Sequence, residues 1–471
     1  MTRSFLSLVA FVATPLVAQQ ATTLTPTQQF ARDVYQELIE LNSSTTTAGT
    51  TNAAQAMAKR FRDAGFPEQD IFLGGVRADK FNVVVRFRGK GGPDGPKPLL
   101  LLAHLDVVEA LKTDWSPDLD PFKFVERDGY FYGRGTTDDK AQAAMFVANV
   151  IRLKQEGYVP NRDIVVALTA DEEGGCCNGA RWLVTNHREL VDAAYVLNEG
   201  GFGFLKNGKP LSNTIEATQK VFGGFNVVAR NPGGHSSLPR PDNAIYQLAA
   251  ALVRFSQFTF PVELNDVTRT YLERTAAVES PENAAAMRAL VKDPRDATAA
   301  ATLSRDPMYN SILRTTCVAT MLKGGHAQNA LPQTAEVYIN CRMLPDAKPA
   351  EVRAAIVKAI ADTTLEVSAA PNRDPREAMP VVPEVMRAVE GVTREMWGNI
   401  PVIPMMMTGA TDAIPWRNLG IPAYGVSGIM IDPNDLRAHG RDERLPVKSF
   451  YEGLDFTYRL TKVLSGGRTI Q

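Results

Sequence analysis

The stretch Leu99-Leu100-Leu101-Leu102-Ala103-His104-Leu105-Asp106 decides the fold of this chain. Its apolar run is typical of a strand that is buried on both faces, as in a parallel sheet. Side chains two residues apart point to the same face of a strand, so His104 and Asp106 leave its carboxyl end together. A metal can bind one nitrogen of such a histidine while a carboxylate orients the ring. By itself, however, the motif is better explained as a hydrogen-bonded polar pair at the end of a strand.

Short apolar runs bounded by glycine and proline recur on both sides of this stretch, with helical patterns between them. We expect further strands at 81–87, 163–169 and 194–197, and helices at 141–155 and 179–190. Strands that alternate with helices predict an α/β domain with a mostly parallel sheet and flanking helices. In such sheets the chemistry lies at the carboxyl ends of the strands.

The pattern changes after residue 219. Alternating segments predict antiparallel strands at 221–229, 312–321 and 336–342, and a polar, alanine-rich helical stretch covers 265–303. We therefore expect a catalytic domain formed by 19–219 and completed by 369–471, with an inserted α+β domain at 220–368.

Acidic residues or histidines follow several of the predicted strands and lie in one late loop. They are Asp138, Asp139, Asp171, Glu172, Glu173, Glu199 and His439. Each one alone is explained at least as well by a helix start or a polar loop, but three adjacent carboxylates are costly unless a cation neutralises them. Two imidazoles and several carboxylates that converge at one sheet edge suit a pair of divalent cations, most naturally zinc. A thermolysin-type site is excluded because the HExxH motif is absent.

The order of these motifs resembles the di-zinc metallopeptidase family that includes aminoacylase, carboxypeptidase S and succinyl-diaminopimelate desuccinylase. The matching segments run from His104 to Glu443 and read HLDVV, DGYFYGRGTTDDK, TADEEGG, NEGG, NPGGHSSLPRPDNAI, NALP, RMLP, GATDA and AHGRDE. This resemblance implies a di-zinc catalytic domain that carries an inserted lid or dimerisation domain, and a homodimer formed through that insert.

The resemblance also implies a role for each matching position. The metal ligands would be His104, Asp138, Glu173, Glu199 and His439, with Asp138 bridging two zinc ions. The catalytic residues would be Glu172 as general base, Asp106 as the partner that orients His104, and His235 as an oxyanion donor that often comes from the partner subunit. The free carboxylate of the substrate would be bound by Arg342 and the Asn329 loop, with Thr411 in the segment that lines the same pocket.

These roles predict a hydrolase that cleaves an amide bond next to a free carboxylate. The substrate would be a small peptide or an N-acyl amino acid, and cobalt or manganese could replace zinc at these nitrogen and oxygen ligands. One alternative is a di-zinc aminopeptidase, although that group lacks the GGHSS insert. A second alternative is a non-catalytic, peptide-binding relative, although such proteins usually lose the base or a ligand.

Composition removes other classes of function. Lysine and arginine number 51 and aspartate and glutamate 52, so the charge gives no reason to expect nucleic acid as a partner. Five histidines and four cysteines exclude a disulfide scaffold and a zinc site built on cysteine pairs. The methionine run 405–407 is expected in the core rather than at a metal.

The N-terminal residues 1–18 have the pattern of a secretory signal peptide: Arg3, an apolar run, and a small residue at Ala18. An uncleaved membrane anchor is the alternative, and no later stretch has the ~20 apolar residues of a transmembrane helix. We therefore expect an exported protein, periplasmic or secreted, in which disulfides are permitted. Cys317 and Cys341 could face each other on neighbouring strands, although buried free thiols are an equal alternative.

Overall fold

The strand that ends at His104 lies in the middle of a large mixed sheet. The structure is a computed structural model that describes residues 23–92, 95–370 and 380–466, and the predicted signal peptide lies outside these residues. The strands of the sheet, in spatial order, are β1 (Ile71–Gly75), β2 (Phe81–Phe87), β6 (Ile164–Thr169), β3 (Leu99–His104), β7 (Tyr195–Asn198), β17 (Ala423–Gly425), β9 (Lys209–Gln219), β8 (Gly203–Lys206) and β18 (Met430–Ile431), with β16 (Val402–Met407) also paired to β9. The central strands β6, β3, β7 and β17 run parallel, so their carboxyl ends share one edge.

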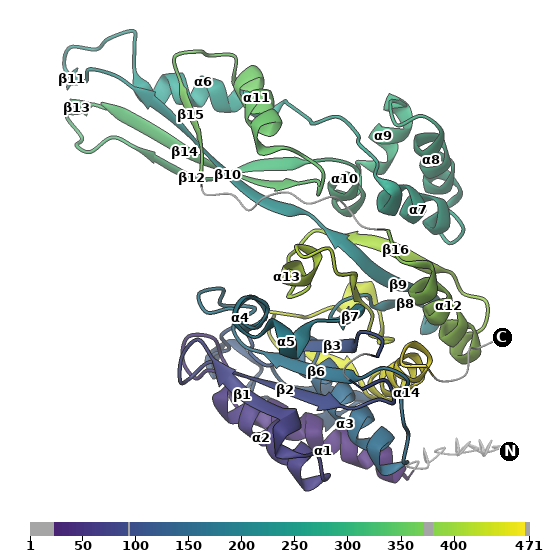
Figure 1. The fold of residues 1–471 in the computed structure, drawn as a ribbon. Coiled ribbons are helices and arrows are strands. Elements are labelled where there is room, and N and C mark those ends of the chain that lie inside the picture. Colours follow the sequence, from purple (N-terminus) through teal and green to yellow (C-terminus); the bar gives the residue numbers. More distant parts are fainter. Residues whose placement is uncertain (1–22, 93–94, 371–379, 467–471) are drawn as a thin grey trace, which may run out of the picture.

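Helices cover both faces of this sheet (Figure 1). One face carries α1 (Pro26–Glu40), α2 (Thr51–Asp63), α3 (Lys140–Gln155), α12 (Pro383–Trp397) and α14 (Val447–Leu464). The other face carries the shorter helices α4 (Gly179–Asn186), α5 (Arg188–Val191) and α13 (Ile414–Arg417). Helix α3 is buried on almost all sides because it packs between the sheet, α1 and α14. The C-terminal segment therefore completes the lobe that the N-terminal segment begins.

A small sheet and short turns surround the edge at which β3 ends. The small sheet contains β4 (Val125–Arg127), β5 (Tyr130–Tyr132) and β19 (Arg444–Pro446), and the 3-10 turns at this edge are η2 (Lys112–Asp114) and η3 (Pro433–Asp435). A third 3-10 turn, η1 (Glu68–Asp70), precedes β1 at the opposite edge of the sheet. Strand β19 pairs with β5, which brings the loop containing His439 beside the loop containing Asp138.

The second lobe is an antiparallel sheet backed by two helices. Its strands lie in the order β12 (Thr316–Gly324), β14 (Thr334–Met343), β10 (Val221–Arg230) and β15 (Glu366–Ala369), and its helices are α6 (Ala244–Ser256) and α11 (Pro349–Ile360). Alternate residues of β14 are buried, as in a sheet with one covered face. A short ribbon of β11 (Gly234–His235) and β13 (Ala330–Leu331) lies at the outer end of this lobe (Figure 1).

The two lobes are joined by one nearly continuous strand. Only Lys220 separates β9 from β10, so the domain boundary predicted after residue 219 falls at this junction. The boundary predicted after residue 368 falls within β15. Cys317 and Cys341 are directly paired on β12 and β14 and form a disulfide.

The polar, alanine-rich stretch forms four separate helices with a small core of their own. They are α7 (Asp266–Thr275), α8 (Pro281–Lys292), α9 (Ala297–Leu303) and α10 (Pro307–Leu313). The strand expected from residue 312 is therefore wrong at its start, because Pro307 and the Asp306 cap begin α10 there. Helix α7 packs against β16, so this helical group lies over the edge of the large sheet. No helix in the described part of the chain is long and apolar enough to cross a membrane.

Candidate metal centre and active site

His104 presents one ring nitrogen to a group of carboxylates. Its Nδ1 lies 3.0 Å from the backbone oxygen of Asp106, and a ring N–H donated to that carbonyl leaves Nε2 as the free ligand atom. Nε2 lies 2.9 Å from Asp138 Oδ1 and 3.4 Å from Glu199 Oε2. The last residue of β3 therefore has the orientation of a metal-binding histidine.

Asp138 stands between two imidazoles. Its Oδ1 faces His104, and its Oδ2 lies 3.1 Å from Nε2 of His439. The same nitrogen of His439 lies 2.7 Å from Oε1 of Glu173. A carboxylate whose two oxygens face two different nitrogen ligands has the arrangement needed to bridge two cations.

The residues present fit a pair of divalent cations. Ligand atoms of His104, Asp138 and Glu173 lie within 4.8 Å of one another, and so do those of His104, Asp139 and Glu199. Glu199 Oε1 is buried without a hydrogen-bond partner among the described residues. An orphaned carboxylate oxygen in such a cluster is explained by a cation, and imidazole with carboxylate is a donor set that zinc accepts.

The pKa values of the carboxylates in the cluster also favour bound cations. Burial, together with the charges of Glu199 and Asp412, raises the pKa of Glu172 to about 10. Burial also raises the pKa of Glu199 to about 7, although His104 opposes the shift. For Asp138, hydrogen bonds with His104 and His439 outweigh burial and lower its pKa. Buried carboxylates that compete for protons in this way become fully ionised when cations bind among them.

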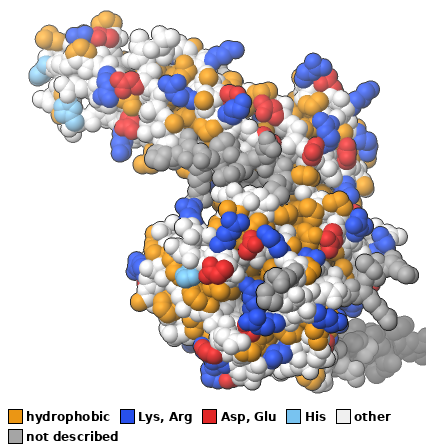
Figure 2. All heavy atoms as spheres, in the orientation of Figure 1, with side chains coloured by type: hydrophobic (Ala, Val, Ile, Leu, Met, Phe, Trp, Pro, Cys, Tyr) orange, Lys and Arg blue, Asp and Glu red, His pale blue; other side chains and the backbone are white. Residues whose placement is uncertain are grey.

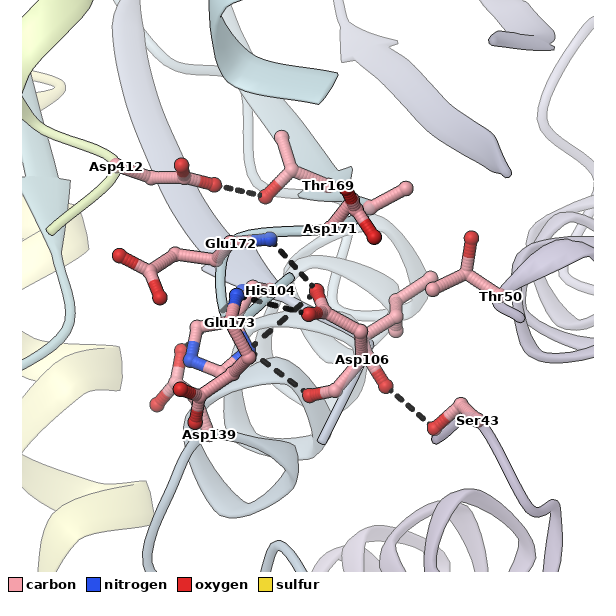
Figure 3. A network of polar contacts seen from close by, with 12 residues as sticks. Ser43, Thr50, His104, Asp106, Asp139, Thr169, Asp171, Glu172, Glu173 and Asp412 are labelled. Atoms are coloured by element: carbon pink, nitrogen blue, oxygen red, sulfur yellow. Dashed lines mark hydrogen bonds and ion pairs between the residues drawn. The ribbon is translucent and has the colours of Figure 1, made fainter. Parts of the chain in front are cut away.

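The turn after β6 sets the positions of Glu172 and Glu173. Asp106 accepts hydrogen bonds from both of their backbone N–H groups, at 3.1 and 3.0 Å (Figure 3). Asp171 adopts a left-handed φ of 61°, and its carboxylate accepts hydrogen bonds from Lys80 Nζ and the backbone N–H of Cys177, both at 2.7 Å. The backbone is therefore fixed on both sides, while the Glu172 carboxylate extends away from Asp106.

Two further carboxylates support the site, and sequence analysis gave neither a role of its own. Glu443 is buried and accepts hydrogen bonds from Arg134 Nη1 and from the backbone N–H groups of Gly135 and Thr137, at 2.8 to 3.0 Å. It therefore holds the Asp138 loop against the His439 loop. Asp412 accepts a hydrogen bond from Thr169 Oγ1 at 2.6 Å, which ties its loop to the end of β6. The only signal in the sequence was the presence of these acids inside the motifs GATDA and AHGRDE.

The residues predicted to bind substrate lie in two different places. Thr411 donates a hydrogen bond to Gln219 at the β9–β10 junction, and Arg342 lies on β14 opposite Phe222, just beyond that junction. His235 and Asn329 lie together at the outer end of the second lobe, where Ser236 N–H donates to Asn329 O at 3.0 Å. Among the described residues, no hydrogen bond or ion pair joins His235 or Asn329 to the carboxylate cluster.

The fold and the cluster together define a two-lobed, metal-dependent hydrolase. Residues 100–462 match the model of "Peptidase family M20/M25/M40", and the chain belongs to this family. The resemblance seen in the sequence is thereby confirmed, as is the mostly parallel α/β architecture. The protein is accordingly an enzyme that hydrolyses amide bonds, as the family and its members indicate.

Individual relatives agree with this assignment. The human N-fatty-acyl-amino acid synthase/hydrolase PM20D1 is 29% identical over 394 residues, which cover 79% of this chain and 75% of that protein. The M20 family metallo-carboxypeptidase Sso-CP2 of Sulfolobus solfataricus superposes with a TM-score of 0.68 at 18% identity, covering 92% of this chain and 99% of that one. The YXEP protein of Bacillus subtilis, described as a dinuclear metal-binding peptidase of the M20 family, has a TM-score of 0.59 at 12% identity, covering 93% of this chain and 98% of that one.

Proposed function

We propose that this enzyme hydrolyses N-acyl amino acids, with two zinc ions at the cluster and Glu172 as the general base. One observation carries the proposal: Asp138 faces His104 with one oxygen and His439 with the other. The Glu172 side chain lies in the same cluster and extends away from Asp106 (Figure 3). A relative that matches most of the chain is named for N-fatty-acyl-amino acids, which favours an acyl amino acid over a peptide.

The zinc ligands in this proposal are His104 and Glu199 at one position, Glu173 and His439 at the other, and Asp138 between them. When bound, two divalent cations polarise the scissile carbonyl and lower the pKa of an attacking water towards ~7. Glu172 takes the proton of that water and passes it to the leaving nitrogen. Asp106 keeps Glu172 in place through the backbone.

Recognition of the substrate carboxylate is assigned to Arg342 and Thr411 at the junction between the lobes. His235 and Asn329 lie at the outer end of the second lobe, so a second copy of the chain would have to supply them. We therefore propose a homodimer formed through residues 220–368, in which His235 of one copy donates to the oxyanion in the other. Size measurement in solution, and loss of activity in His235→Ala that is restored by mixing with Glu172→Gln, would test this arrangement.

We also propose that residues 1–18 are removed during export to the periplasm or the medium. N-terminal sequencing of the protein recovered from its producing cell tests this. A mature N-terminus at Gln19 supports export, whereas retention of Met1 in a cytoplasmic fraction contradicts it.

The test of the reaction is a substrate panel with zinc-loaded protein and its Glu172→Gln variant. The panel contains N-acyl amino acids, dipeptides, and the same compounds with the carboxylate converted to an amide. We expect turnover of N-acyl amino acids with a free carboxylate, lost in the variant. Turnover of amidated compounds, or of dipeptides alone, would contradict the proposal.

A further inference from the structure

A large, mostly apolar cavity lies between the helices α7 and α10 and the edge of the main sheet. Its volume is about 680 Å³, within the roughly 300–1,000 Å³ typical of small-molecule sites. Its apolar walls come from both parts of the molecule, and include Phe204, Leu211, Met405, Met407, Ile312 and Leu436. Figure 2 shows hydrophobic side chains gathered at the waist between the two lobes, where α7 faces β16 in Figure 1.

Residues that line the cavity are close in sequence to one proposed ligand of each cation. Gly201 and Phe202, which line it, directly follow the segment of Glu199 and Gly200. Leu436, on another wall, comes shortly before His439. Met407 closes the gap in space: its Cε lies 3.5 Å from the position a Cβ would occupy at Gly200. The cavity therefore lies beside the segments that carry Glu199 and His439, although neither of these two residues lines it.

Most of the lining is apolar, although the hydroxyl groups of Ser212, Thr214 and Thr275 are among it. Met308 and Leu436 are 50% and 49% exposed, so the apolar lining continues to the mouth of the cavity. Lys206, Asp306 and Asp432 line it but are exposed to solvent, and the buried part of Glu279 is already bonded to Tyr309. Among the described residues that line the cavity, none is a buried cation that could pair with a charged substituent, so the mostly apolar lining suits a hydrocarbon.

We propose that this cavity binds the hydrocarbon tail of a long, unbranched acyl group whose amide carbonyl lies at the metal centre. This inference rests on the proposed function, because it places the amide of an N-acyl amino acid at the cluster. Met405 and Met407 suit the task, since unbranched thioether side chains adapt to a flexible ligand. The helices α7 and α10 thereby act as a wall of the substrate site.

The first experiment measures kcat/KM for N-acyl-leucines with acetyl, hexanoyl, decanoyl and hexadecanoyl chains, below their micelle concentrations. Each buried methylene contributes about 0.8 kcal/mol, or about fourfold, so kcat/KM should rise by at least tenfold from acetyl to decanoyl and level off once the cavity is filled. A flat profile with ready turnover of the acetyl compound overturns the cavity inference and leaves the proposed function intact. Absence of turnover for every N-acyl-leucine, with dipeptides cleaved, overturns the proposed function instead.

A pair of matched variants tests whether the dependence of kcat/KM on acyl chain length arises in this cavity. Leu211→Asp places a charge in the cavity wall, while Leu419→Asp places the same charge on an exposed leucine elsewhere. We expect the ratio of decanoyl to acetyl kcat/KM to fall at least tenfold in Leu211→Asp and to stay unchanged in Leu419→Asp. Equal ratios in both variants and the parent contradict the assignment.

Direct binding gives a readout without turnover. Calorimetric titration with decanoate should show binding to the parent protein and to Leu419→Asp, at least tenfold weaker in Leu211→Asp. Unchanged zinc content and circular dichroism in both variants exclude misfolding as the cause. Decanoate that binds all three proteins equally, or none of them, contradicts the proposed cavity site.

Discussion

Asp106 Oδ1 accepts a hydrogen bond from the backbone N–H of Glu172, with a nitrogen-to-oxygen distance of 3.1 Å. The other oxygen of Asp106 accepts from the next N–H along the chain. One buried carboxylate thus fixes the backbone of two neighbouring glutamates beside His104, without using either of their side chains. The proposed base and its neighbouring ligand are therefore positioned together.

Replacing Glu172 tests its chemical role. Glu172→Gln keeps the size of the side chain but removes the proton acceptor, so we expect kcat to fall by about 10²–10⁴-fold. Metal content, measured by elemental analysis, should stay unchanged. Glu189→Gln, an exposed glutamate on α5, is the matched control. Parent-like turnover in Glu172→Gln would show that another group accepts the proton.

Replacing Asp106 tests whether this residue positions Glu172 and Glu173. In Asp106→Asn an amide NH₂ faces one of the two backbone N–H groups, so at least one hydrogen bond is lost. We expect metal affinity or kcat/KM to fall by about 10–100-fold, measured by competition with a zinc chelator and by steady-state kinetics. A variant that keeps both values contradicts the positioning role.

The disulfide between Cys317 and Cys341 should stabilise the second lobe. The two cysteines are 24 residues apart, and closing a loop of that length in the unfolded chain is worth about 3–4 kcal/mol. The double variant Cys317→Ser/Cys341→Ser should therefore unfold at a lower temperature, while zinc content stays the same. Reducing agent should lower the thermal midpoint of the parent but leave that of the double variant unchanged. Equal sensitivity of both proteins to reductant would mean that this bond contributes nothing.

Lys220 should make stability depend on pH. Its ammonium group is buried and donates hydrogen bonds to the backbone oxygens of Ser311 and Arg314, at 2.7 and 2.8 Å. Burial, with the charge of Arg342 in addition, lowers its pKa to about 7 in the folded protein, against about 10.4 in an unfolded chain.

The sign of the effect follows from which state holds the proton. Below pH 7 Lys220 is protonated in both the folded and the unfolded protein, so the free-energy cost of burying its charge is present in full. Above pH 7 the folded protein loses this proton first, and the cost of burial falls by about 1.4 kcal/mol per pH unit until about pH 10. The unfolding free energy of the parent should thus rise between pH 7.5 and 9 relative to Lys220→Met, as followed by denaturant titration. Lys358→Met, on the exposed face of α11, should keep the slope of the parent. Parallel curves for the parent and Lys220→Met would contradict the shifted pKa.

Removal of metal should cost both activity and stability. Chelation leaves several buried carboxylates without a cation, so the thermal midpoint of the chelated protein should fall and turnover should stop. Addition of zinc, cobalt or manganese should restore both, in an order that identifies the preferred ion. Full turnover in protein shown by elemental analysis to be metal-free would remove the cations from the mechanism.

The local sequence pattern was enough to predict those site residues that directly follow apolar strands. His104 ends β3, Glu172 and Glu173 follow β6, and Glu199 follows β7, and parallel strands bring such ends to one edge. Strand β9 was not predicted, because its sequence is polar; it is buried because β16, β17 and β8 all pair with it.

Features that depend on distant packing could not be predicted from the sequence. The ion pair between Lys80 and Asp171 joins segments 91 residues apart, and neither residue has a periodic signal. The methionine run was expected in the core, yet only Met406 is fully buried, and all three methionines line the cavity. The cavity itself forms where α7 and α10 of the insert lie beside β8, β9 and β16.

The proposed ligands are spread from residue 104 to residue 439, with the joining strand and the whole second lobe between them. A nascent chain therefore cannot hold both cations until almost all of it has been synthesised. Metal loading becomes a checkpoint on completed folding: a truncated or stalled product lacks His439, and stays without the charge neutralisation that its buried carboxylates require. Such products would be poorly active and also recognisably unstable, which makes them ready substrates for proteolytic disposal.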